Sequence, residues 1–110
     1  MPGLTPLTYQ ILLALADGDR HGYGIIKEIE QRSGSSSSPS TGALYLALQR
    51  MEGEGLIAEA TERPAEADDA RRRYYRISAK GRERAQQESK HLAALVAAAR
   101  AKNLLAEGVS

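Results

Sequence analysis

The amino-acid sequence predicts a mainly α-helical chain of the α+β class, in the order helix, helix, helix, β-hairpin and long helix. Three observations predict this order. Apolar residues recur at helical spacing in the first half of the 110 residues. Two runs near residues 60 and 75 alternate instead, as strands do. Helical spacing then returns and holds for roughly seven turns, up to about residue 105.

Two helices are expected in the first third of the chain. The first covers residues 8–17, with Thr5 and Pro6 at its start and Gly18 as its C-cap. The second covers residues 21–32. The side chains expected to face the core are Ile11, Leu12, Leu15 and Ala16 from the first helix, and Tyr23, Ile25, Ile26 and Ile29 from the second.

A glycine- and serine-rich stretch, residues 34–39, is expected to be a linker before the third helix. The third helix begins at Ser40 or Thr41, either of which can be its N-cap, and it ends at residues 53–55. Its inward face is expected to consist of Leu44, Ala47, Leu48 and Met51. Its outward face is expected to consist of Tyr45, Leu46, Gln49 and Arg50.

The β-hairpin and the last helix complete the expected fold. The strands cover residues 57–62 and 72–78, and Ser78 is the expected N-cap of a helix over residues 79–105. Residues 4–78 would then form a winged helix-turn-helix domain with a two-stranded β-wing, followed by a long C-terminal dimerisation helix. The last helix carries a stripe of apolar residues that so small a core cannot bury. We therefore expect this helix to pair with the same helix of a second copy. The stripe contains Ala85, Leu92, Leu95, Val96 and Ala99.

The composition excludes several classes of function. The longest apolar run, residues 92–99, is far too short to span a bilayer, and no secretory signal is visible. Without cysteine there is no disulfide, thiolate metal site or cysteine nucleophile. His21 and His91 lie far apart, and we find no phosphate loop or nucleophile motif. We therefore expect a cytoplasmic protein that has no metal or cofactor and is not an enzyme.

The net charge of +1 gives no overall attraction for nucleic acid. The signs separate locally, with an acidic run at residues 66–69 directly before Arg71, Arg72 and Arg73. On a wing, these arginines would neutralise phosphates or enter the minor groove. The alternative is a solvated loop in which the acidic residues pair with the arginines.

Several segments, in order and at matching spacing, resemble the PadR family of bacterial regulators. They are LTPLTYQILLAL at residues 4–15, HGYGI at 21–25, GALY at 42–45 and RRYYRIS at 72–78. The resemblance covers nearly the whole chain. It implies the family's short form, a homodimer in which the C-terminal helix packs with the first helix. It also implies binding to inverted-repeat operators and release by a small effector.

Two positions depart from the family pattern. Ala43 stands where the family usually has threonine or serine, and Leu46 stands where a polar or charged residue is usual. The operator sequence therefore cannot be transferred from relatives. Tyr74 and Tyr75 point to opposite faces of a strand, so one is expected in the core and the other near DNA or the wing surface. The resemblance implies that Tyr75 is the structural one.

The outward face of the third helix is the candidate recognition surface, because a helix fits the major groove. Leu46 would meet a thymine methyl group, unless it belongs to the core. Ser40 and Thr41 would contact phosphate, and Gly42 would permit close approach to the backbone. The predicted DNA-binding residues are Ser40, Thr41, Gly42, Tyr45, Leu46, Gln49, Arg50, Arg71, Arg72 and Arg73.

The sequence thus predicts a transcriptional repressor whose partners are double-stranded DNA, a second copy and a small hydrophobic effector. Two alternatives stay open, a winged-helix protein–protein interaction module and a hydrophobic-ligand-binding dimer. The apolar stripe could line an effector pocket or form plain dimer core. The predicted dimer interface consists of Ile11, Leu15, Leu92, Leu95, Val96 and Ala99.

Overall fold

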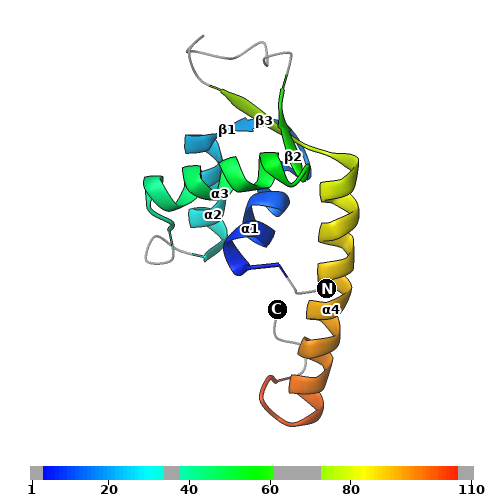
Figure 1. Ribbon diagram of the computed structural model, residues 1–110. Helices are drawn as coiled ribbons and strands as arrows, with labels where there is room; N and C mark the ends of the chain where they lie inside the picture. Colours follow the sequence, from blue (N-terminus) through cyan, green and yellow to red (C-terminus); the bar gives the residue numbers. More distant parts are fainter. Residues whose placement is uncertain (1–3, 34–37, 61–72, 107–110) are drawn as a thin grey trace.

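The computed structural model describes residues 4–33, 38–60 and 73–106. Three short helices pack together with a small sheet at one end, and the long helix runs along their side (Figure 1). The predicted order of helices and hairpin is confirmed, with one added strand. The elements are α1 (Pro6–Leu15), β1 (Arg20–His21), α2 (Gly22–Ser33), α3 (Thr41–Gly53), β2 (Ile57–Glu59), β3 (Tyr74–Ile77) and α4 (Ala79–Ala101).

The wing strands belong to a three-stranded antiparallel sheet in the order β1-β3-β2. Ile57 of β2 lies opposite Ile77 of β3, and on the other side Arg20 of β1 lies opposite Tyr75. The sequence did not predict β1 because two residues are too few to show the alternation that marks a strand. Because β1 pairs with β3 and leads directly into α2, it connects the start of α2 to the wing.

Capping side chains set where the helices begin. Thr5, expected at the start of the first helix, is the N-cap of α1, and its Oγ1 accepts from the Thr8 amide at 3.2 Å, so the helix begins at Pro6 and not at residue 8. Ser78 caps α4, as predicted, and Ser40, one of the two candidates, caps α3. The second helix begins at Gly22, one residue later than expected, and His21 Nδ1 accepts from the Gly24 amide at 3.0 Å.

Two helices end earlier than expected. The first helix, α1, ends at Leu15, where arginine side chains from other elements donate hydrogen bonds to its last carbonyl groups. Arg20 Nε donates to the Ala14 carbonyl at 2.8 Å, and Arg82 Nη2 donates to the Ala16 carbonyl at 2.9 Å. The long helix ends at Ala101, because Asn103 adopts a left-handed backbone with φ of 64° that turns the chain back.

The core lies between α1, α2, α3 and the sheet. The predicted inward faces of α1 and α3 are confirmed except at Ala16, which is exposed beyond the end of α1. Ile25 and Ile29 of α2 are buried as expected, but the inward prediction for Tyr23 is wrong, since it is 55% exposed. Tyr23 lies roughly half a turn around the helix from Ile25, on the opposite side from the core.

Both wing tyrosines are buried. Tyr75 belongs to the core cluster, so its structural role is confirmed. Tyr74 is buried too, and the ring of His21 meets it edge-on at a centroid distance of 5.2 Å. The expectation that one tyrosine would lie at the surface is therefore wrong, because β1 pairs with the edge of β3 that a two-stranded hairpin would leave open and brings the His21 ring against Tyr74.

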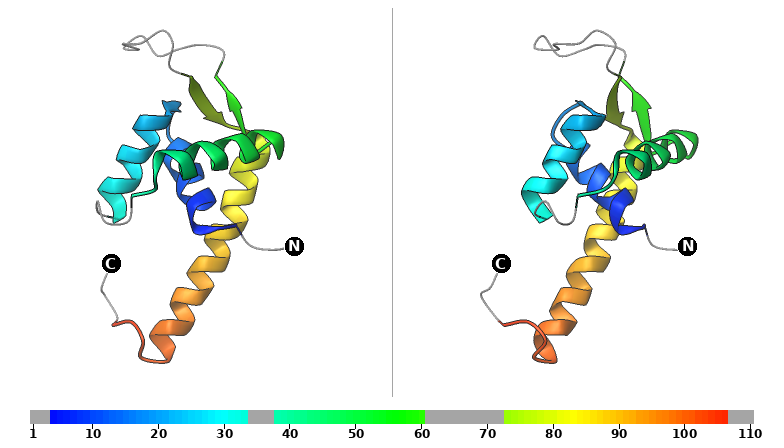
Figure 2. Two further views of the ribbon diagram at one scale, coloured as in Figure 1. Left: turned by 60° about the vertical axis from the view of Figure 1, so that its left-hand side comes forward. Right: turned by 90° about the vertical axis from the view of Figure 1, so that its left-hand side faces the viewer.

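The long helix is fastened at its start and projects at its end. Ser78 Oγ donates to the Gly55 carbonyl at 2.6 Å, and Lys80 Nζ donates to the Glu54 carbonyl at 2.7 Å. The second half of α4 extends past the other helices (Figure 2). No helix in the described ranges is long and apolar enough to cross a membrane.

Candidate nucleic-acid interface

The outward face of α3 is exposed over its whole length. Leu46 is 69% exposed and Tyr45 is 46% exposed, so the alternative that Leu46 belongs to the core is wrong. Thr41, Gly42 and Gln49 are exposed on the same helix. Leu46 therefore presents an apolar side chain to solvent on the side of α3 opposite its four core residues.

The start of α3 is arranged around its N-cap. Ser40 Oγ accepts from the Ala43 amide at 3.1 Å, so this hydroxyl already serves the helix. The amides of the first turn point out of the helix end, where they attract anions. A Cβ added at Gly42 would meet nothing within 4 Å. The protomer therefore has no internal need for glycine at this exposed position.

Tyr45 is held by the start of α2. A Cβ added at Gly22 would collide with the Tyr45 hydroxyl, so only glycine allows the ring to lie there. Sequence reasoning missed this role of Gly22. The glycine before an aromatic residue at the start of α2 was visible, but the contact joins residues that only the fold brings together. The α3 face thus continues onto the start of α2.

Arg50 lies on the exposed surface, but its side chain bonds to α1. Its Nη2 donates to Thr8 Oγ1 at 2.6 Å, and Thr8 is almost fully buried. Thr5 Oγ1 donates to the same oxygen at 2.8 Å. This arrangement connects the recognition face with α1, through two threonines that sequence reasoning did not assign to the site.

Of the three predicted wing arginines, only Arg73 lies within the part of the chain that the structure describes. Arg71 and Arg72 lie outside the described residues, as do the acidic residues 66–69. Arg73 Nε donates to Glu59 Oε1 at 2.9 Å, and its Nη2 donates to Glu52 Oε1 and Oε2 at 3.3 and 3.2 Å. Its guanidinium also lies 5.3 Å above the ring of Tyr75. Burial raises the pKa of Tyr75, and the positive charge of Arg73 opposes that rise.

The predicted dimer residues separate into two groups. Ile11 and Leu15 are fully buried in the protomer core. We therefore correct the assignment of these two residues to a dimer interface, because their own protomer already covers them. Leu95 and Val96 are 52% and 40% exposed, and Leu92 and Ala99 are half-buried.

The stripe on α4 is continuous along the helix. Gly81, Ala85 and Glu88 lie on the same side as Leu92 and Ala99, and they face the body of the protomer. Glu88 Oε1 accepts from the Leu4 amide at 3.5 Å, next to α1. Beyond that point α4 has left the other helices, and the stripe continues with Leu92 and Ala99 half-buried and Leu95 and Val96 more exposed.

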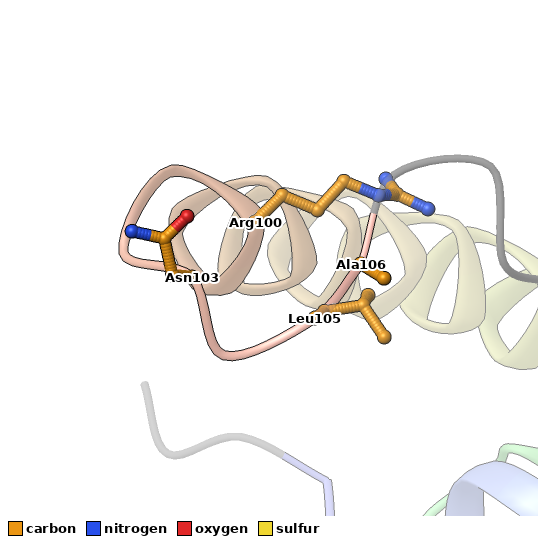
Figure 3. Close-up of a pocket in the computed structure, with 4 residues that line it drawn as sticks. All are labelled: Arg100, Asn103, Leu105 and Ala106. Atoms are coloured by element: carbon orange, nitrogen blue, oxygen red, sulfur yellow. The ribbon is translucent and has the colours of Figure 1, made fainter.

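A hollow of about 470 Å³ lies where the chain turns back after α4, lined by Arg100, Asn103, Leu105 and Ala106. Figure 3 shows the Leu105 and Ala106 side chains in the returning segment, beside the last turns of the helix. None of these residues was expected to line an effector pocket. Among the residues with described positions, no cluster of three or more His, Asp or Glu could hold a metal ion.

Comparisons with known proteins find a family model, a sequence relative and solved structures that are similar to this chain. Residues 11–87 match the sequence model of the transcriptional regulator PadR-like family. An uncharacterized 37.1 kDa protein in transposon TN4556 of Streptomyces fradiae is 41% identical over 85 residues, which cover 77% of this chain and 22% of that protein. The matched part is therefore only about a fifth of the relative's length.

Two solved structures are similar in fold. A PadR family transcription regulator from hypervirulent Clostridium difficile is 25% identical, with a TM-score of 0.75 and coverage of 87% of this chain and 96% of that one. Bacillus subtilis PadR in complex with operator DNA is 23% identical, with a TM-score of 0.63 and coverage of 76% and 47%.

Proposed function

The chain belongs to the PadR-like family of transcriptional regulators, which are not enzymes, and from this premise we propose that it is a repressor. In this proposal it binds an inverted-repeat operator as a homodimer in the cytoplasm. The two copies of α3 enter successive major grooves, and the wings lie over the flanking backbone.

The exposed face of α3 is the observation that carries the proposal. Leu46 and part of the Tyr45 ring expose apolar surface beside the polar Gln49. Apolar contacts to thymine methyl groups and amide hydrogen bonds to adenine are the means by which a helix reads the major groove. The fold shared with Bacillus subtilis PadR, whose structure contains operator DNA, supports this use of the face.

The projecting half of α4 supports the homodimer. Its stripe has the same orientation as the part that packs on α1, but Leu95 and Val96 remain half-exposed. A second copy related by a two-fold axis would cover both stripes at once and would place two recognition helices on one side of the duplex.

Selection of bound fragments from the genomic DNA of the source organism tests the proposal. We expect enrichment of an inverted repeat, with half-sites protected by the protein roughly 10 bp apart, centre to centre. A fragment upstream of the chain's own gene should be among those enriched. No enriched sequence, or binding as a monomer to a single half-site, would contradict the proposal.

We extend the proposal to release by a small hydrophobic effector that binds beside the α4 stripe of the dimer. A thermal-shift screen of hydrophobic compounds, followed by operator titration with each stabilising compound, tests this part. A compound that stabilises the protein and weakens operator binding supports release. A compound that stabilises the protein and leaves operator affinity unchanged favours a hydrophobic-ligand-binding dimer instead.

A further inference from the structure

Arg73 has a role other than the one its place in an arginine run suggests. We propose that Arg73 is a positioning residue that holds the wing strands against the end of α3, and that it does not contact phosphate. The inference rests on the proposed DNA-binding function, because the wing and α3 must meet the same duplex.

The contacts of Arg73 join three elements. Glu59 of β2 accepts from its Nε, Glu52 near the end of α3 accepts from its Nη2, and Tyr75 of β3 lies beneath its guanidinium. Glu59 is also the register partner of Tyr75 across the β2–β3 pair. One side chain therefore connects the recognition helix with both strands of the wing.

The position of this cluster matters because it lies at the end of the β2–β3 pair farther from the point where β2 leaves α3. The Ala60 amide donates to the Tyr74 carbonyl at 2.8 Å, next to the Glu59–Tyr75 pair. Arg73 directly precedes β3 at this end of the strand pair. A contact from Arg73 to Glu52 thus fixes the angle at which the two strands leave α3.

The charge of the cluster opposes a phosphate contact. The cluster, defined as Arg73, Glu52 and Glu59, combines one guanidinium with two carboxylates and carries a net charge of −1. A phosphate approaching Arg73 would meet two carboxylates that already accept from its Nε and Nη2. Arg71 and Arg72, which lie outside the described residues, are the arginines to test for phosphate contacts.

Whether operator affinity rises or falls in one double variant separates a positioning role of Arg73 from a phosphate contact. In the variant with Glu52→Gln and Glu59→Gln, two negative charges near the duplex are removed. If Arg73 positions the wing, operator affinity falls by about three- to tenfold, because the charge-assisted contacts are weakened. If Arg73 contacts phosphate, affinity rises, because the arginine is released and repulsion is reduced.

Glu54→Gln is the matched control, since Glu54 is an exposed acid at the same end of α3. We expect it to leave affinity unchanged or to raise it slightly. Arg73→Ala should weaken binding without changing the salt slope, and it should add no further loss in the double glutamine variant. Circular dichroism and thermal unfolding confirm that each variant is folded.

Unchanged or tighter binding of the double glutamine variant would overturn the inference. So would an Arg73→Ala variant whose salt slope falls by about 1, the change expected on losing one phosphate contact. Neither result touches the proposed function, which fails only if the unmodified protein binds no operator in the same assay.

Discussion

Single residues on the candidate interface differ in how their side chains are already used. Ser40 caps its own helix, Arg50 bonds to Thr8, and Arg73 bonds to two glutamates. Leu46 and Gln49 instead project into solvent from the exposed side of α3, and Tyr45 projects beside them with its ring against Gly22. Base recognition is therefore expected from this second group, and the bonded residues set the position of the helix and the wing.

Gly42→Ala should separate stability from binding. Alanine is favoured over glycine in helices by up to about 1 kcal/mol, so the free energy of unfolding should rise slightly. Operator affinity should fall, because the added methyl group occupies space at the close approach to the DNA backbone. Gly53→Ala is the control, since an added Cβ there also meets nothing within 4 Å. Equal affinity for Gly42→Ala and wild type would remove Gly42 from the interface.

Leu46→Ala should change which operator is preferred while leaving stability the same. Losing contact with a thymine methyl group should cost about 1 kcal/mol, roughly fivefold in affinity, at one base pair per half-site. Titration against operators changed at single base pairs measures this. Leu104→Ala, at a leucine that is 78% exposed and lies beyond α4, is the control. A uniform loss across all operators would argue against base contact by Leu46.

The positions of single residues could be predicted from the sequence where helical spacing or local side-chain chemistry determines them. The inward positions of α3 and the caps Ser40 and Ser78 were predicted, because local spacing and side-chain chemistry determine them. The partners of Arg73 were not, because Glu52 and Glu59 come close to it only in the folded chain. For the same reason Tyr74 was expected at the surface.

At the scale of elements, the start of α4 is the joint between the winged domain and the projecting helix. Ser78 and Lys80 bond to carbonyl groups of the turn between α3 and β2. Gly81 packs against the Leu56 carbonyl so closely that an added Cβ would collide with it. The direction of α4 therefore follows from the end of α3.

Gly81→Ala should destabilise the protein strongly. The methyl group meets backbone that cannot turn aside, so we expect a loss of about 1–3 kcal/mol or more in the free energy of unfolding. Chemical denaturation monitored by circular dichroism measures it, with Gly53→Ala as the control in open space. Unfolding midpoints equal to that of wild type would show that the joint adapts and that α4 is not held at this point.

Elements were predictable where they were long. The order and approximate bounds of the four helices follow from period and caps, whereas the short β1 gave no periodic signal. Helix ends differed where tertiary contacts intervene, as at α1, whose last carbonyl groups bond to Arg20 and Arg82.

For the whole molecule, the shape and the exposed stripe point to a second copy. The protomer extends 50 Å along its longest axis and 30 and 25 Å along the others, because α4 projects. The winged domain alone has a complete core, and the apolar surface left on α4 is what the proposed second copy would bury.

Leu95→Asp should convert the protein to a folded monomer, because the dimer would have to bury an unpaired charge. Operator affinity should fall by at least about 100-fold, since two half-sites would no longer be bound together. Ala94→Asp, on an exposed position roughly opposite the stripe, is the matched control. Light scattering coupled to gel filtration gives the mass, and a dimeric Leu95→Asp variant would refute this interface.

The most direct test of sequence-specific recognition is the ratio of two dissociation constants at physiological salt. One is measured for the operator upstream of the chain's own gene and the other for a shuffled duplex of equal length. With a net charge of only +1, non-specific attraction is weak, and contacts from the α3 face must supply most of the preference. We predict that the operator is bound at least about 1,000-fold more tightly than the shuffled duplex. Equal affinity for the two duplexes would contradict the account.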